Sequence, residues 1–67
     1  MINRIGANVR KIRQGKGISQ DCLSKMSDLS LNTIVKIETG ESPNPTIETL
    51  EKISNALDVS ITELFKD

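Results

Sequence analysis

The sequence predicts an all-α fold, a compact bundle of five short helices in a single domain of 67 residues. Apolar residues recur three and four positions apart in each segment between turns, which is the spacing of one buried helix face. No segment alternates apolar and polar residues with a period of two, so strands are not expected. Hydroxyl side chains that cap helices precede most of these segments. Without repeats, low complexity or an interdomain linker, residues 1–67 form one expected domain.

The first two helices are predicted from their apolar spacing and their ends. The apolar positions of the first helix are Ile2, Ile5, Val9 and Ile12. They share one face, and the helix ends near residues 15–17, which read Gly-Lys-Gly. Ser19 caps a second helix over residues 20–26, because its hydroxyl can accept from a free amide of the first turn. Leu23 and Met26 form the expected buried face of that helix.

A three-residue turn, 27–29, leads to a third helix over residues 30–39. Ser30 caps this helix, and Gly40 ends it in the left-handed backbone conformation. Its inner face carries Ile34 and Ile37, and its outer face carries Leu31, Asn32, Val35, Lys36 and Thr39. A helix face that contacts only water gains nothing from a β-branched residue such as Val35 beside the amide of Asn32 and the ammonium group of Lys36. The outer face is therefore expected to contact another molecule.

Two more helices follow a connection that contains two prolines. Residues 41–45 read Glu-Ser-Pro-Asn-Pro and cannot lie inside a helix, because proline lacks an amide proton and restricts the preceding residue. Thr46 caps a fourth helix, whose inward positions are Ile47, Leu50, Ile53 and Leu57. Residues 60–63, Ser-Ile-Thr-Glu, form a capping box that opens a fifth helix. The apolar residues of the fifth helix are Ile61, Leu64 and Phe65.

The composition offers little for catalysis, metal binding or membrane insertion. The chain has no His, Tyr or Trp and a single Cys, so neither an internal disulfide nor a zinc site is expected. No glycine-rich phosphate loop occurs, and no Ser or Cys has a histidine to activate it. No apolar run reaches about 18 residues, and no secretion signal is evident. We therefore expect a cytoplasmic protein that is not an enzyme and uses no cofactor.

The charge of the chain is zero in total but uneven along its length. Residues 1–38 hold seven lysines and arginines against three acids, whereas residues 39–67 hold two against six. Such asymmetry suggests that the first half faces a polyanion. The sequence pI of about 6.2 is nevertheless far below that of a typical nucleic-acid-binding domain. Charge alone leaves nucleic-acid binding and an ordinary charged helical surface equally open.

The second and third helices, with the turn between them, have the shape of a helix-turn-helix. The residues that agree with one such family in order and spacing are Ile5, Gly6, Arg10, Arg13, Gly17, Ile18, Ser19, Gln20, Leu23, Ile34, Glu38, Gly40, Pro45, Leu50, Ile53, Leu57, Asp58, Val59, Ser60 and Leu64. On these residues the chain resembles the Cro/lambda-repressor-type family, also called the XRE family, over nearly its whole length. The resemblance implies a helix-turn-helix at about residues 19–39, followed by helices over about residues 46–66.

Three positions depart from the pattern of that family. Ser24 replaces a usual alanine that packs against the third helix, and serine is small enough to fit. Asp28 replaces a usual turn glycine, but aspartate is one of the few other residues that visit the left-handed region. Cys22 replaces a common glutamate and loses the reciprocal half of a capping box. None of these departures changes the expected fold.

The resemblance implies that the outer face of residues 30–39 reads DNA in the major groove. It implies base contacts by Leu31, Asn32, Val35 and Lys36, and backbone contacts by Arg10, Ser19, Gln20, Ser30, Thr33 and Asn44. Asparagine can pair with adenine, lysine can donate to guanine, and aliphatic side chains can pack on the thymine methyl group. The alternative is that the polar residues are ordinary surface and the apolar ones are scattered exposed residues, which are common.

The resemblance also pairs Arg13 with Glu38 across the first and third helices. A two-point Arg–carboxylate pair would orient the recognition helix, whereas a casual surface pair would contribute only about 0–1 kcal/mol. Val59, Ile61 and Phe65 supply more apolar surface than the last helix needs to cover the core. They predict a homodimer through the C-terminal third, and the alternative places them in the core.

Together these observations favour sequence-specific binding of double-stranded DNA by a transcriptional regulator with the recognition helix at residues 30–39. The rival interpretation is a protein-interaction module, such as an antitoxin-like or antirepressor component. In that case Leu31 and Val35 would dock on a partner protein, and the acidic half would repel DNA. Nothing in the sequence identifies the operator or a small-molecule effector.

Overall fold

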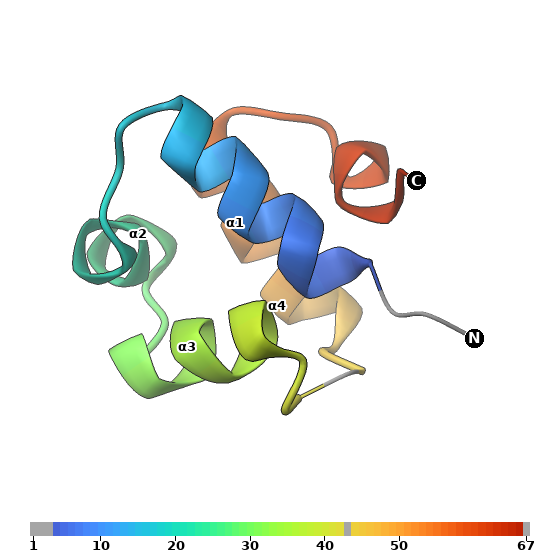
Figure 1. Ribbon diagram of the computed structural model, residues 1–67, viewed down its shortest axis with the longest axis horizontal. Helices are drawn as coiled ribbons and strands as arrows, with labels where there is room; N and C mark the ends of the chain where they lie inside the picture. Colours follow the sequence, from blue (N-terminus) through green and yellow to red (C-terminus); the bar gives the residue numbers. More distant parts are fainter. Residues whose placement is uncertain (1–3, 43, 67) are drawn as a thin grey trace.

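A computed structural model describes residues 4–42 and 44–66 and contains no strand within them. Its elements are α1 (Ile5–Gly15), α2 (Gln20–Ser27), α3 (Leu31–Thr39), α4 (Ile47–Leu57) and η1 (Ile61–Phe65) (Figure 1). The predicted all-α class is confirmed. Ile2, which the spacing adds to the first helix, lies outside the described residues, as does Pro43 in the connection before α4.

The last element differs from the expected fifth α-helix, because η1 is a 3-10 helix of five residues. The Ser60 hydroxyl accepts from the amide of Thr62 at 3.4 Å, and the Glu63 amide donates to the Ser60 carbonyl at 2.9 Å. The predicted capping box is therefore wrong, and the Glu63 carboxylate instead pairs with Lys66 at 2.6 Å. Bonds between residues three apart suit such a short segment, since an α-helix needs a longer run to repay its nucleation.

The other predicted caps are present. The hydroxyl groups of Ser19, Ser30 and Thr46 accept from amides three residues later, at 3.0, 3.1 and 3.1 Å. Each cap satisfies one of the amides that the first helical turn leaves without a partner. The positive φ angles of Asp28, 58°, and Gly40, 83°, end α2 and α3 as expected. The turn between the two helices is thus fixed at both ends by local chemistry.

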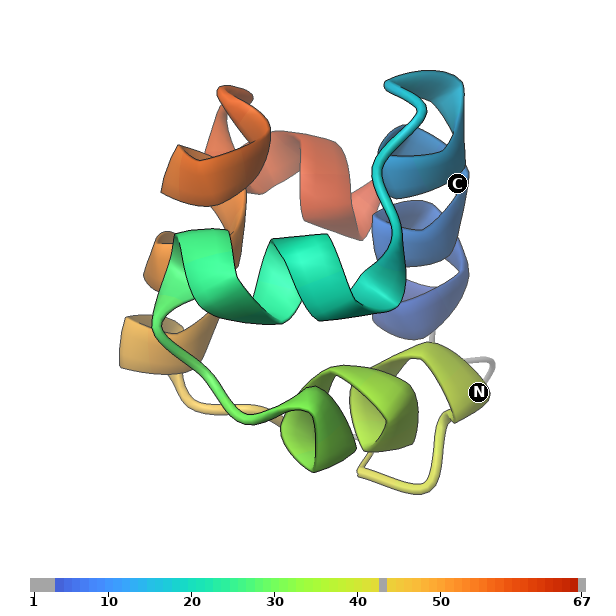
Figure 2. The same ribbon diagram turned by 90° about the vertical axis from the view of Figure 1, so that its left-hand side faces the viewer.

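One apolar core joins all five elements. Its residues are Val9, Leu23, Ile34, Ile37, Leu50, Ile53, Leu57 and Leu64, each at most 2% exposed. α1 packs against α3 and η1, and α2 packs against α3 and α4. Figure 2 shows α2 and α3 at the front of the molecule, so one side of the fold is formed by the helix-turn-helix. The predicted inward positions Leu23, Ile34, Ile37, Leu50 and Ile53 are confirmed.

Two positions predicted to be buried are exposed. Met26 is 51% exposed because the inner face of α2 runs instead through Ser24 and Ser27. The hydroxyl groups of these serines donate to the helix carbonyls of Asp21 and Leu23, both at 2.7 Å, so burial leaves neither unsatisfied. Ile47 is 60% exposed because it is the first residue of α4, one turn before the helix meets the core at Leu50.

No described helix is both long enough and apolar enough to cross a membrane.

Candidate nucleic-acid interface

The outer face of α3 combines polar and apolar side chains on a helix whose inner face is buried. Ile34 and Ile37 are at most 2% exposed, whereas Leu31 is 43% exposed. Asn32 and Lys36 are also exposed, and Val35 is half-buried. The face therefore presents an amide, an ammonium group and two aliphatic side chains to whatever approaches it.

The N-terminal end of α3 is held by two hydroxyl groups. Ser30 accepts from the Thr33 amide, and the hydroxyls of Ser30 and Thr33 lie 2.8 Å apart in a hydrogen bond of their own. Thr33 is half-buried, so its hydroxyl belongs to the cap more than to the outer face. Ser30 is exposed and lies beside the first turn of α3, where main-chain amides are free to bind an anion.

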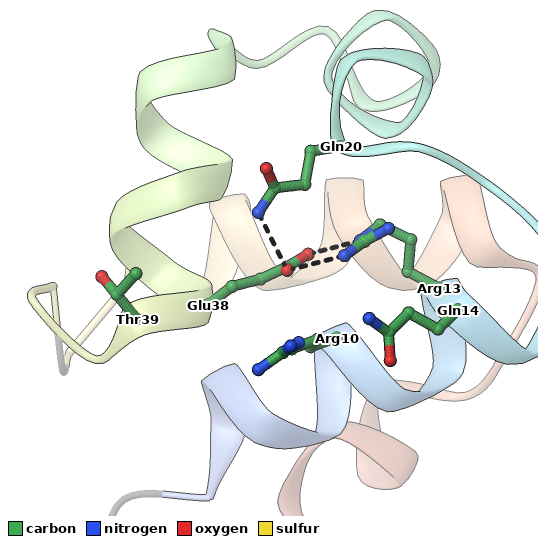
Figure 3. A pocket seen from close by; sticks show the side chains of 6 residues that line it. All are labelled: Arg10, Arg13, Gln14, Gln20, Glu38 and Thr39. Carbon is green, nitrogen blue, oxygen red and sulfur yellow. Dashed lines mark hydrogen bonds and ion pairs between the residues drawn. The ribbon is translucent and has the colours of Figure 1, made fainter.

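The C-terminal half of α3 is fixed by a three-residue cluster around Glu38. Arg13 Nε donates to Glu38 Oε2 at 2.7 Å, and Arg13 Nη2 donates to Oε1 at 3.0 Å. Gln20 Nε2 donates to the same Oε1 at 3.1 Å, so the carboxylate is approached from α1 and from α2 (Figure 3). The third nitrogen of the guanidinium, Nη1, donates to the Ile18 carbonyl at 2.7 Å.

The ion pair in this cluster is shielded from water. The side chains of Arg13 and Glu38 are 11% and 3% exposed. The hydrogen bond to Glu38 raises the pKa of Arg13 above its ordinary value, burial lowers it, and the charge of Glu38 raises it further. Arg13 therefore stays charged throughout the usable pH range. A two-point pair of this kind fixes the direction of both side chains as well as their distance.

An open hollow of about 320 Å³ lies beside this cluster, between α1, the start of α2 and the end of α3. It is lined by Arg10, Arg13, Gln14, Gln20, Glu38 and Thr39 (Figure 3). The Arg10 side chain is exposed and has no hydrogen bond or ion pair with the other described residues. Its guanidinium is therefore available to an anion at the rim of the hollow.

The predicted backbone-contacting residues are only partly brought together. Gln20 and Arg10 share the hollow, and Ser19 directly precedes Gln20 at the start of α2. Ser30 stands at the start of α3, and Asn44 is exposed in the connection that leads to α4. Their contacts with DNA stay a prediction.

The sequence does not indicate the hydrogen bond between Gln20 and Glu38. No periodicity links two residues 18 positions apart on different helices, and only the way α2 meets α3 places them together. This bond uses one of the two N–H groups on the Gln20 amide, which leaves the other free to donate.

The C-terminal third exposes one aromatic side chain. Val59 and Ile61 are partly buried against the core, whereas Phe65 is 51% exposed. Asn8 Nδ2 donates to the carbonyls of Leu64 and Lys66, at 2.9 and 2.6 Å, so α1 holds the end of η1 in place. Phe65 therefore stands on a fixed segment and not on a free tail.

The family model described as helix-turn-helix matches residues 9–64, which is most of the chain. The chain therefore belongs to the XRE-type helix-turn-helix family, as its residue pattern indicates. It is 41% identical over 61 residues to the HTH-type transcriptional regulator SlrR of Bacillus subtilis (strain 168), covering 91% of this chain and 40% of that protein. The chain spans 57% of SinR from the same organism, to which it is 33% identical over 63 residues.

Two solved structures have the same fold at similar identity. The crystal structure of the biofilm regulator SinR in complex with DNA matches with a TM-score of 0.89 and 34% identity, covering 92% of this chain and 98% of that one. The restriction-modification controller protein C.AhdI from Aeromonas hydrophila matches with a TM-score of 0.89 and 32% identity, covering 94% of each chain. These relatives are regulators by name.

Proposed function

We propose that this chain is a DNA-binding domain of a transcriptional regulator that places α3 in the major groove and reads a specific double-stranded sequence. The observation that carries this proposal is the outer face of α3, where Leu31, Asn32 and Lys36 are exposed on a helix that Arg13 of α1 holds through Glu38. Family membership supports it, as does the solved complex of SinR with DNA. No catalytic role is assigned to any residue.

Each reading side chain has a chemical role in this proposal. Asn32 accepts from N6 and donates to N7 of an adenine, and Lys36 donates to O6 or N7 of a guanine. Leu31 and Val35 offer no hydrogen bond and pack on the C5-methyl group of a thymine. The mixture on the outer face thus corresponds to the mixture of groups that base pairs display in the major groove.

A second set of residues fixes the domain on the sugar-phosphate backbone. The proposed contacts are Arg10, Ser19, Gln20, Ser30, Thr33 and Asn44. Arg10 supplies a free charge, and the capped starts of α2 and α3 supply main-chain amides and the positive ends of helix dipoles. Such contacts set register and orientation without reading sequence.

The domain is further proposed to act as a homodimer in the cytoplasm. Phe65, exposed on a segment that Asn8 holds in place, supports an interface that also includes Val59 and Ile61. A two-fold dimer would place two recognition helices about 34 Å apart on a roughly palindromic site. Pairing would also double the phosphate contacts of a chain with no net charge.

Titration with salt tests the proposal against the rival, a protein-interaction module that uses exposed Leu31. Fluorescence anisotropy of a labelled random duplex would be followed from 50 to about 200 mM salt, with Arg10→Gln as the matched variant. Phosphate contacts release counterions, so the logarithm of affinity should fall linearly with the logarithm of salt concentration, and Arg10→Gln should reduce the slope by about 1. No binding to DNA at low salt would favour the rival.

A further inference from the structure

Gly6 lies in the first turn of α1 with its Cα turned toward the C-terminal end of α3. A methyl group at this position would overlap the carbonyl oxygen of Ile37 and would lie 3.1 Å from the carbonyl carbon of that residue. It would also lie 3.2 Å from the carbonyl oxygen of Glu38. All three are main-chain atoms, so no side chain can rotate away to make room. Gly6 therefore sets how closely α1 approaches α3.

Gly6 and Arg13 both contact the C-terminal end of α3. They are seven positions apart and so share one face of α1. Gly6 lies against the main-chain carbonyl groups of Ile37 and Glu38, and Arg13 binds the Glu38 carboxylate at 2.7 Å. α1 thus fixes α3 near its C-terminal end, whereas the reading residues begin at Leu31, about 10 Å away along the helix axis.

We infer that Gly6 is a positioning residue for DNA recognition, which sets the orientation at which α3 presents its outer face to the bases. A side chain at position 6 must push the two helices apart by at least about 1.3 Å to reach ordinary van der Waals contact with the Ile37 carbonyl oxygen. If the start of α3 stays in place, this displacement over a lever of about 10 Å tilts the axis of α3 by about 7°. The groups of a binding site must be held within about 0.5 Å of their productive positions, so a displacement of more than about 1 Å is large enough to disturb recognition. The inference rests on the proposed function, because it concerns the same outer face of α3.

The chain supplies a matched control in the same helix. Gly15, the last residue of α1, has no atom within 4 Å of the position that a Cβ would occupy, and its φ is not positive. Gly15→Ala therefore adds the same methyl group and the same helix propensity without a collision. It should leave α3 where it is and raise the stability of α1.

The experiment compares wild type, Gly6→Ala, Gly15→Ala and the double variant by two measurements. The first is the specificity ratio, the affinity for the duplex that the wild type selects divided by the affinity for a random duplex. Partial unfolding lowers both affinities equally, so a purely structural role would leave this ratio unchanged. The second measurement is made without DNA: amide residual dipolar couplings report the orientation of α3 relative to α1.

The inference predicts that Gly6→Ala lowers the specificity ratio at least about tenfold, comparable to the loss of one base contact, and reorients α3. Gly15→Ala should change neither quantity, and the double variant should recover stability without recovering the ratio. A folded Gly6→Ala with the ratio and orientation of the wild type would overturn the inference. So would failure of the double variant to fold, because Gly6 would then act on folding alone.

The two measurements separate this inference from the proposed function. If the wild type selects no duplex, the proposed function fails. The dipolar couplings then still decide whether Gly6 sets the orientation of α3: a reorientation in Gly6→Ala supports that part, and an unchanged orientation refutes it.

Discussion

Arg13 on α1 and Glu38 on α3 form a two-point ion pair, with Nε–Oε2 at 2.7 Å and Nη2–Oε1 at 3.0 Å. Both side chains are almost fully withdrawn from water. Removing one partner leaves the other as a buried charge without compensation, which is far more costly than losing an exposed pair. The pair therefore couples α1 to α3, the helix that carries the outer face.

This coupling predicts a large interaction energy in a double-mutant cycle. Arg13→Met and Glu38→Gln should each lower the free energy of unfolding by about 3 kcal/mol, and the double variant should lose clearly less than the sum. The exposed pair Asp21–Lys25, at 3.2 Å on the surface of α2, is the control and should show a coupling below about 0.5 kcal/mol. Urea denaturation measures both cycles. Equal coupling in the two cycles would refute an orienting role for the Arg13–Glu38 pair.

The core predicts that two apolar residues of α4 differ in how much they contribute to stability. Leu50 is 2% exposed, so Leu50→Ala should reduce stability by about 2–5 kcal/mol through lost burial and a residual cavity. Ile47 stands one turn earlier and is 60% exposed, so Ile47→Ala should cost less than about 0.5 kcal/mol. Thermal or urea unfolding of both variants measures these two losses of stability. A loss below about 1 kcal/mol for Leu50→Ala would contradict the burial of Leu50 in the core.

The fold was largely predictable because each helix carries its own start signal and its own apolar face. Ser19, Ser30 and Thr46 stand where the caps are found, and Gly40 takes the left-handed conformation that its position predicts. These are local features, and local features can be read from a sequence. The capping pattern at Ser60 was misleading, because a segment of five residues closes more readily with 3-10 bonds.

The exposed positions and the Glu38 cluster were less predictable, for a different reason. Periodicity places Met26 beside Leu23, but the direction from which α4 covers α2 decides which side of that face is buried. Hydroxyl groups at Ser24 and Ser27 can be buried because their own helix satisfies them, which hydrophobicity alone does not indicate. The bond between Gln20 and Glu38 depends on the tertiary arrangement of two helices. The residues of the outer face were predictable, whereas their contacts with DNA stay a prediction.

The proposed dimer predicts a dependence of molecular mass on Phe65. Sedimentation at micromolar concentration should give a dimer for the wild type and a monomer for Phe65→Asp, because a charge would enter an apolar interface. Met26→Asp is the matched control, since Met26 is also 51% exposed but lies on α2. A wild type that is monomeric and still binds a single half-site with full affinity would leave the dimer without support.

The two classes of proposed DNA contact predict different signatures. Lys36→Met should cost about 1–3 kcal/mol on the preferred duplex and relax the requirement for one base pair. Arg10→Gln should weaken all duplexes about equally, because a phosphate contact carries no sequence information. Affinities on a panel of single-base variants of the preferred duplex distinguish the two. If Lys36→Met weakens every duplex equally, the assignment of Lys36 to a base is wrong.

Selection of bound sites from a library of random double-stranded DNA tests the central claim most directly. If α3 reads bases through Leu31, Asn32, Val35 and Lys36, repeated rounds with the wild type should enrich one sequence, and Asn32→Ala should relax the preference at one base pair of each half-site. A homodimer predicts that this sequence is roughly palindromic, with half-sites about one helical turn apart. A bound pool as random as the starting library would contradict the claim that this domain reads sequence.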